Sequence, residues 1–368
     1  MLTRLIALVR KELLATARDR QTRFIVLIAP PLLLLIYVFA ITQDVSNIAI
    51  GVVDRDPGRY SREIVDRVAG SPSFTTVRHF ETLDQMAAAI DAQQILLGLQ
   101  FESDFSRRVL RGVPATAQVV IDGRRSNAGQ IASGYISRIV QGYNLELMVQ
   151  AGIRPPSTVV ARTWFNPNGI PVWSATPSLF AVMAAIVGFM VSALAIARER
   201  ELGTFDQLLV SPLTPLEILV GKTLPALIIA VVSSAVMLAF AALLLSVPIR
   251  GNLGVLLLTM TIYLSAIIGI GLFISSLVRT QQQAFIGMFI YLVPAVLLSG
   301  YATPVANMPG WLQVVAETGP ITHFIVISKG IFLKDMPLSD IWTHTWPLLL
   351  NAAFTLSAGA WFFRRRMG

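Results

Sequence analysis

Cysteine is absent from the 368-residue sequence, which excludes disulfides, thiol catalysis and cysteine metal sites. Histidine is scarce too: His79, His323 and His344 form no His-x-x-x-His pair, and we expect no metal site. Charged residues make up only 14% of the chain, against about 25% in a typical soluble domain. With 54% hydrophobic residues and a mean hydropathy of +0.67, the composition indicates a membrane protein.

The net charge of +8 could suggest nucleic-acid binding, but the positions of the basic residues argue against it. Lys and Arg occur in short clusters that flank apolar runs, which is typical of the residues that orient membrane proteins. We therefore expect membrane lipids, and no nucleic acid, as partners.

Long apolar runs occur once before a polar block at residues 42–175 and five times after it. A helix rises about 1.5 Å per residue, so a bilayer core of about 30 Å needs roughly 20 residues. Six segments meet or approach this length: residues 24–41, 179–196, 224–245, 255–277, 284–298 and 346–363. The first is too long for a signal peptide and lacks a small-residue cleavage site, and Pro30 and Pro31 predict a kink in it. We expect an α-helical polytopic membrane protein with six transmembrane helices.

Lys and Arg counts in the short loops predict the orientation. Segments 1–23, 197–223 and 364–366 together with Arg279 hold thirteen basic residues, whereas the short loops of the other side hold three. Both termini are therefore expected in the cytoplasm. Residues 1–23 form an interfacial amphipathic helix in this prediction, and residues 42–175 lie outside the cytoplasm.

The external block mixes strand and helix patterns, which predicts an inserted α/β or α+β domain. Strands are expected at 48–53, 95–101, 115–121 and 159–165, and helices at 60–68 and 83–92. A long helix follows, with apolar residues spaced by four from Ile131 to Leu147. A few charged residues could bind a ligand, but aspartates before Pro and Gly usually form turns, and we favour turns with solvated arginines: Asp54, Asp56, Asp122, Arg124 and Arg125.

The cytoplasmic segment 197–223 is the most patterned polar stretch. Charged residues follow the second span, an apolar turn ends at Ser211-Pro212, and Thr214 can cap a new helix with Glu217 as capping-box partner. The segment either anchors the loop at the interface or presents a rigid helix to a cytoplasmic partner.

Gly221-Lys222-Thr223 invites comparison with a phosphate-binding loop. Such a loop needs another glycine five residues before the Gly-Lys pair, and position 216 is leucine. We therefore expect no nucleotide or other cofactor in this chain, and no catalysis by it.

The spans contain few ionisable residues, which disfavours a proton relay or a sodium pump. Hydroxyl residues in the spans could line a path or, as we favour, pack helices: Ser233, Ser234, Thr259, Thr261, Ser265, Ser275 and Ser276. The broken stretch 311–332 predicts one or two half-inserted or surface helices within an external segment, 299–345. There Glu317, with Trp311 and His323, could guard an exit or could face water.

Three parts of the sequence resemble the membrane subunit of ABC-2 type exporters, in the branch with a large loop after the first span. The first is an N-terminal run containing Arg10, Lys11 and Glu12, followed by Arg18, Asp19 and Arg20. Another is Leu298-Ser299-Gly300-Tyr301 with Pro304, Asn307-Met308-Pro309 and Trp311-Leu312. The remaining part is the most specific and is similar to the family's ATPase-coupling region: Arg198, Glu199, Arg200, Glu201, Gly203, Thr204, Phe205, Gln207, Leu208, Ser211 and Pro212.

The resemblance implies a permease subunit in a bacterial inner membrane that exports drug-like or amphiphilic cargo. It implies a second permease, a separate cytoplasmic ABC ATPase subunit that binds ATP and Mg, and, in Gram-negative members, a periplasmic adaptor protein. A lipid or polysaccharide exporter is the alternative within transport. A membrane sensor or assembly scaffold with an external binding domain is the alternative from another class. A secondary transporter is disfavoured, because internal repeats and coupling residues in the spans are not evident.

Overall fold

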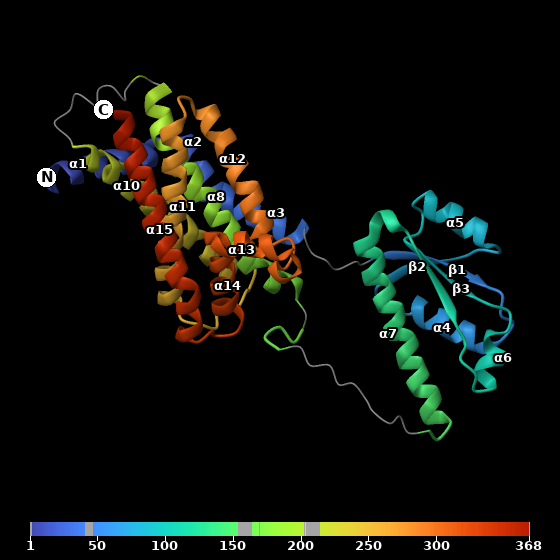
Figure 1. The fold of residues 1–368 in the computed structure, drawn as a ribbon. Helices are drawn as coiled ribbons and strands as arrows, with labels where there is room; N and C mark the ends of the chain where they lie inside the picture. The colour runs from blue at the N-terminus through green and yellow to red at the C-terminus, as the bar shows by residue number, and fades with distance from the viewer. Residues whose placement is uncertain are drawn as a thin grey trace. The chain divides into compact units, whose positions relative to one another are not determined.

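The computed structural model describes residues 2–40, 47–153, 164–168, 170–201, 203 and 214–367. The chain divides into two units, which we describe separately. A helical unit comprises Met1–Thr42 and Arg162–Gly368, and a second unit comprises Gln43–Ala161 (Figure 1).

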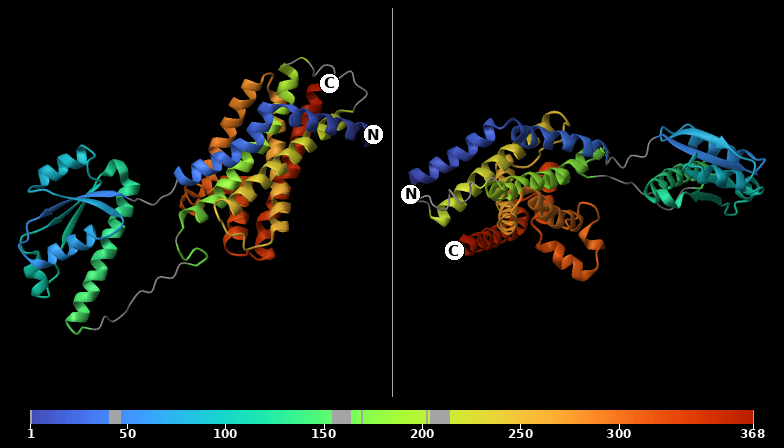
Figure 2. Two further views of the ribbon diagram at one scale, coloured as in Figure 1. Left: turned by 180° about the vertical axis from the view of Figure 1, so that it is seen from behind. Right: turned by 90° about the horizontal axis from the view of Figure 1, so that it is seen from above.

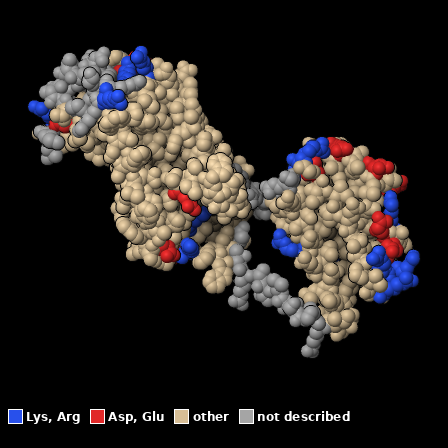
Figure 3. Space-filling model, viewed as in Figure 1, with Lys and Arg blue, Asp and Glu red and all other residues tan. Residues whose placement is uncertain are grey.

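The helical unit consists of long apolar helices joined by short connections. Its helices are α1 (Leu2–Arg18), α2 (Arg20–Arg23), a π-helical turn at Phe24–Ile28, α3 (Ala29–Ala40), α8 (Pro171–Glu201), α10 (Pro215–Leu243), α11 (Leu253–Leu277), α12 (Gln281–Leu298), a 3-10 turn at Val305–Asn307, α13 (Gly310–Thr318), α14 (Pro320–Leu333) and α15 (Leu338–Met367). Five of them are long and apolar enough to cross a membrane: α8, α10, α11, α12 and α15. The chain is therefore a multi-pass membrane protein. On the face drawn in Figure 3, charged side chains of this unit gather toward its two ends, with an uncharged band between them.

Helix α8 is the central helix of this unit. It packs against α3, α10, α11, α12 and α14, and 72% of its most apolar window is buried. Small residues allow close approach to α11, since a Cβ on Gly271 would overlap the Ser192 side chain. The buried Tyr263 hydroxyl of α11 donates to Ala181 O of α8 at 3.0 Å. These contacts fix α8 and α11 as one packed pair.

The first predicted span is a shorter apolar helix, Val26–Ala40, and Ile41 lies outside the described residues. Backbone carbonyls one turn before residues 30 and 31 cannot accept the usual helical hydrogen bond from them, because both residues are proline and carry no N–H. Val26 O would accept from position 30 in an α-helix or from position 31 in a π-helix. It accepts instead from the buried Ser233 hydroxyl of α10, at 2.5 Å. This contact supports helix packing as the role of Ser233.

The broken segment after α12 contains two helices, α13 and α14, which meet at Gly319 and Pro320. Much of α14 is core rather than surface: Phe324 is fully buried and stacks on Tyr263, with ring centroids 4.3 Å apart. The last helix, α15, begins at Leu338. Residues 338–345, predicted to belong to the external segment, are thus continuous with the last span, and α15 runs through Pro347 without a break.

The second unit is built on a four-stranded sheet of order β2-β1-β3-β4. Its strands are β1 (Ile48–Asp54), β2 (Phe74–His79), β3 (Leu97–Phe101) and β4 (Ala117–Ile121). Strand β1 pairs in parallel with β2 and β3, and β3 pairs antiparallel with β4. The helices are α4 (Arg59–Ala69), α5 (Leu83–Asp91), α6 (Phe105–Leu110) and α7 (Ser126–Gln150), and a 3-10 turn at Gly123–Arg125 precedes α7.

Alternating side chains of β1 give the sheet two packed faces. Ile50 and Val52 join the core formed with α4 and α7, whereas Val53 joins a smaller core with Met86 of α5. The predicted strands at 48–53, 95–101 and 115–121 correspond to β1, β3 and β4, with starts shifted by up to two residues in β3 and β4. The strand predicted at 159–165 lies largely outside the described residues. Strand β2 was not predicted, because only Phe74 of its six residues is buried and its sequence does not alternate clearly.

Candidate functional site

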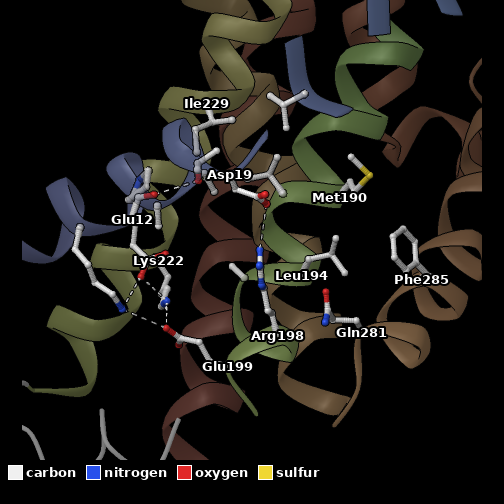
Figure 4. A pocket seen from close by; sticks show the side chains of 18 residues that line it. Glu12, Asp19, Met190, Leu194, Arg198, Glu199, Lys222, Ile229, Gln281 and Phe285 are labelled. Carbon is white, nitrogen blue, oxygen red and sulfur yellow. Dashed lines mark hydrogen bonds and ion pairs between the residues drawn. The ribbon is translucent and has the colours of Figure 1, made fainter. Parts of the chain in front are cut away.

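A buried lysine connects three helices at one end of the helical unit. Lys222 of α10 has a side chain that is only 2% exposed. Its Nζ donates to Glu12 Oε1 of α1 at 2.8 Å, and also to Glu199 Oε1 of α8. Lys11 Nζ lies 3.3 Å from Glu12 Oε1 and 3.8 Å from Glu199 Oε1. Two cations therefore face two carboxylates, as Figure 4 shows, and we call these four residues the Lys222 cluster.

Close packing of α1 on α10 brings the cluster together (Figure 2). A Cβ on Gly221 would lie 2.8 Å from Leu8 Cγ and closer still to the end of that side chain. Glu12 follows Leu8 by four residues and so lies on the same face of α1. Glycine at 221 thus admits α1, and the neighbouring Lys222 meets Glu12. This packing explains Gly221-Lys222-Thr223 without a nucleotide, since all three residues lie within α10.

The electrostatics of the cluster favour a charged Glu12. Burial alone would raise the pKa of the Glu12 carboxyl, but the charge and hydrogen bond of Lys222, with smaller effects from Lys11, hold it below its ordinary value. A buried charge that loses its partner is costly. The three helices are therefore tied together for as long as both signs of charge are present.

The last turn of α8 makes three further links. Arg200 donates to Ser276 O at 3.0 Å and to Val278 O at 2.9 Å, both at the C-terminal end of α11, where a cation is favourable. Glu201 accepts from the backbone N–H of Gln281, at the start of α12, at 2.9 Å. Arg198 lies 3.9 Å from Asp19 in a more exposed pair. The charged residues after the second span thus bind the ends of neighbouring elements.

A cavity of about 380 Å³ opens beside the cluster. Glu12, Glu199 and Lys222 line its polar part, and Leu194 and Phe285 belong to its apolar part, as Figure 4 shows. Because residues of α1, α8, α10 and α12 line the cavity, a change in its volume would require these helices to move relative to one another.

The structure places the other predicted site residues as follows. Gly203 has a φ of +71°, a conformation that suits glycine and ends α8. Arg10, Arg18 and Arg20 are exposed on α1 and α2. The predicted coupling residues of the loop lie outside the described residues: Thr204, Phe205, Gln207, Leu208, Ser211 and Pro212. The predicted capping box is confirmed, with Thr214 N donating to Glu217 Oε2 at 2.8 Å and Glu217 N to Thr214 Oγ1 at 3.3 Å.

Two residues at the other end of the unit come together unexpectedly. His323 of α14 and His344 of α15 approach to 3.2 Å between their Nδ1 atoms, and His323 Nε2 lies 2.7 Å from Glu317 O. Trp311 is 71% exposed on α13. Sequence reasoning missed the pairing of His344 because it placed 299–345 in a half-inserted external segment and began the last span at 346. It missed Lys222 because it counted that lysine in the cytoplasmic segment 197–223. The signal for Lys222 was an ionisable residue within a continuous helical stretch.

Comparisons with known proteins extend over both units. The profile of a family described as ABC-2 family transporter protein matches residues 20–361. The chain is 43% identical over 367 residues to the probable multidrug ABC transporter permease YbhR of Escherichia coli K12, covering 100% of each. It is 28% identical over 332 residues to the inner membrane transport permease YhhJ of the same strain, covering 89% of this chain and 88% of YhhJ. It is 26% identical over 361 residues to the probable multidrug ABC transporter permease YbhS of that strain, covering 97% and 93%.

Proposed function

Because the chain belongs to the ABC-2 family of transporter proteins, we propose that it is the membrane-spanning permease subunit of an ATP-binding-cassette exporter. A separate cytoplasmic ATPase subunit, holding ATP and Mg, supplies the energy. The observation that carries this proposal is the Lys222 cluster, which ties α1, α8 and α10 together and whose Glu199 and Lys222 flank the segment 202–213 in the sequence. The chain itself is not an enzyme in this proposal.

The proposed topology has six transmembrane helices with both termini in the cytoplasm of a bacterial inner membrane. The excess of Lys and Arg in segments 1–23, 197–223 and 364–366 supports this orientation. In addition to the five long helices, the shorter apolar helix Val26–Ala40 is proposed to cross the membrane, together with the residues that adjoin it in the sequence. The second unit, Gln43–Ala161, is then the extracytoplasmic α/β domain, shorter than the predicted 42–175 because α8 already begins at Pro171. Helices α13 and α14 lie in the half-inserted external segment.

The positions of Glu199 and Lys222 support a mechanism for coupling to the ATPase. These residues stand on either side of the loop at 202–213 and bind each other directly. A force that the ATPase applies to the loop would therefore move the ends of α8 and α10 together, and α1 with them through Glu12. Arg200 and Glu201 would pass the movement to α11 and α12.

The cargo that we propose is drug-like or amphiphilic; the relatives YbhR and YbhS are described as probable multidrug permeases. A second permease completes the path, and a periplasmic adaptor protein is a further proposed partner. A lipid or polysaccharide exporter would use the same coupling site and differ in cargo.

Co-purification tests the proposal. The tagged chain, expressed from its own locus together with the flanking genes, should retain an ABC ATPase subunit and show ATPase activity. Leu208→Glu and Gly203→Glu should reduce the activity, whereas Leu110→Glu, on an exposed position of α6, should not. An absent ATPase, or one that is indifferent to the loop variants, would contradict the proposal.

A further inference from the structure

Two adjoining hollows lie on the helical unit: a pocket at the end that carries α13 and α14, and a groove that runs from it along α15 toward the other end. Helix α12 starts beside Glu201 and rises for 18 residues, about 27 Å, so the pocket is far from the Lys222 cluster, whereas the groove extends to Phe273 near the C-terminal end of α11. An apolar groove of about 860 Å³ lies between α11, α12 and α15 and is lined by residues such as Ile270, Phe273, Ile290, Pro294, Ala358 and Phe362. A pocket of about 700 Å³ adjoins it, with Glu317, Thr322, His323, His344, Trp346 and Asn351 in its wall. We call them the apolar groove and the acceptor pocket.

The two hollows share part of their walls. Thr318, Thr322, Asn351 and Phe354 line both. From Asn351 to Phe362 the groove follows α15 for about 16 Å at 1.5 Å per residue. The residues that line the groove in the described part of the chain include no Lys, Arg, Asp or Glu. A molecule that fills both hollows must therefore be apolar at one end and polar at the other.

The hydroxyl and amide protons of the acceptor pocket are already used by backbone carbonyls. Thr318 Oγ1 donates to Val315 O at 2.7 Å, Thr322 Oγ1 to Ala316 O at 2.7 Å, and Thr343 Oγ1 to Ser339 O at 3.2 Å. Asn351 Nδ2 donates to Thr318 O at 3.2 Å and to Pro347 O at 2.9 Å. Because a carbonyl can only accept, these contacts fix the amide orientation and leave Asn351 Oδ1 as an acceptor.

The histidine pair is arranged in the same way. His323 Nε2 must donate to Glu317 O, so in the neutral ring Nδ1 of His323 is an acceptor. Nδ1 of His344 then donates to it across 3.2 Å, and Nε2 of His344 is left with its lone pair. Glu317 adds a carboxylate, and no Lys or Arg is among the described residues of this wall. Trp346 adds an exposed aromatic face that can attract a cation, and an indole N–H that can only donate.

We propose that the apolar groove and the acceptor pocket together bind a transported amphiphilic ammonium ion, with its chain along α15 and its N–H groups on Glu317, Asn351 and His344. The proposal deepens the function proposed above by naming the class of cargo and the place where it binds. A wall in which acceptors predominate, with one formal negative charge, selects a protonated amine over a carboxylate, and an amine with N–H groups over a quaternary one.

Binding of matched probes to the purified permease in phosphatidylcholine nanodiscs tests the site without ATP. The probes are dodecyl chains with a dansyl group at one end and an ammonium, trimethylammonium or carboxylate head at the other, measured at pH 8 with empty nanodiscs as the blank. The ammonium probe should bind about tenfold more tightly than the carboxylate probe. Equal affinities for the three heads would overturn the proposal.

Variants separate the head from the chain. Glu317→Gln should weaken the ammonium probe about fivefold and leave the carboxylate probe unchanged or tighter. Ala358→Leu should fill the groove and weaken all three probes. Asp335→Asn, an exposed carboxylate in the turn before α15 that lies outside the wall, is the matched control and should change nothing. Indifference to both Glu317→Gln and Ala358→Leu would refute the site.

Two further arms identify the occupant. Replacing phosphatidylcholine by phosphatidylethanolamine offers a lipid ammonium head: a transported amine keeps its affinity, whereas loss of binding would assign the site to lipid and overturn the assignment to cargo. With the ATPase subunit present, the ammonium probe should stimulate ATP hydrolysis, less so in Glu317→Gln. Selective binding of the ammonium probe without any co-purified ATPase would contradict the exporter function but support the site. ATPase activity in the complex without selectivity for the head group would support the exporter function but contradict the site.

Discussion

Replacing Lys222 by methionine is the sharpest perturbation of the coupling site. The change keeps the length of the side chain in α10 and removes the cation that faces Glu12 and Glu199, whose side chains are 22% and 13% exposed. Removing one partner of a buried ion pair costs about 3–5 kcal/mol. Lys11, 59% exposed and 3.3 Å from Glu12, would compensate in part, so we expect a loss of about 2–3 kcal/mol.

Thermal unfolding in detergent measures this loss. At about 2–4 °C per kcal/mol for a unit of this size, the Tm of Lys222→Met should fall by about 5–10 °C. The triple variant Lys222→Met, Glu12→Gln, Glu199→Gln should recover most of the loss, because neutral residues leave no buried charge unpaired. A wild-type Tm for Lys222→Met, or a triple variant that is less stable than the single one, would refute the electrostatic reasoning.

Three further predictions concern the same unit. Gly221→Ala should lower stability by about 1–3 kcal/mol through overlap with Leu8, and adding Leu8→Ala should restore part of it; equal Tm values with and without Leu8→Ala would contradict the close approach of α1. Ser233→Ala should cost about 1–3 kcal/mol, because Val26 O then has no donor next to Pro30 and Pro31. Ser234→Ala should cost little, since the buried Ser234 hydroxyl has no hydrogen-bond partner among the described residues. Equal Tm losses in the two variants would argue against a special role of Ser233. The pKa of Glu12 lies below its ordinary value of 4.5, so its ionised form contributes stability that is fully present above pH 4.5 and is lost as the pH falls through the folded-state pKa. The Tm difference between the wild type and Glu12→Gln should therefore shrink as the pH falls below 4.5, and a difference that stays constant until acid unfolds both proteins would show that Glu12 is not the titrating group.

Local patterns predicted much of the fold. Apolar runs of sufficient length predicted the five long helices, and shorter strand-like runs closed by turn residues after residue 47 predicted β1, β3 and β4. The capping box at Thr214 and Glu217 was readable because both partners lie within one turn. Strand β2 was not readable, since an edge strand with one buried residue carries little signal.

Contacts between distant parts of the chain were beyond sequence reasoning. Glu12 and Lys222 are 210 residues apart, and nothing in either local sequence specifies that α1 packs on α10. The glycine that allows this packing was examined only as part of a phosphate-binding motif. His323 and His344 were also seen only as isolated residues, because their pairing depends on how α14 returns against α15.

The most direct test of the account is cargo-stimulated ATP hydrolysis by the complex of this permease with its ATPase subunit, measured well below the Tm of each variant. We expect Lys222→Met to retain the bound ATPase and its basal rate but to lose most of the stimulation, because α1, α8 and α10 no longer move as one. The matched control, Arg107→Met on α6 of the second unit, should behave as the wild type. Full stimulation in Lys222→Met would contradict the claim that the Lys222 cluster couples the ATPase to the membrane helices.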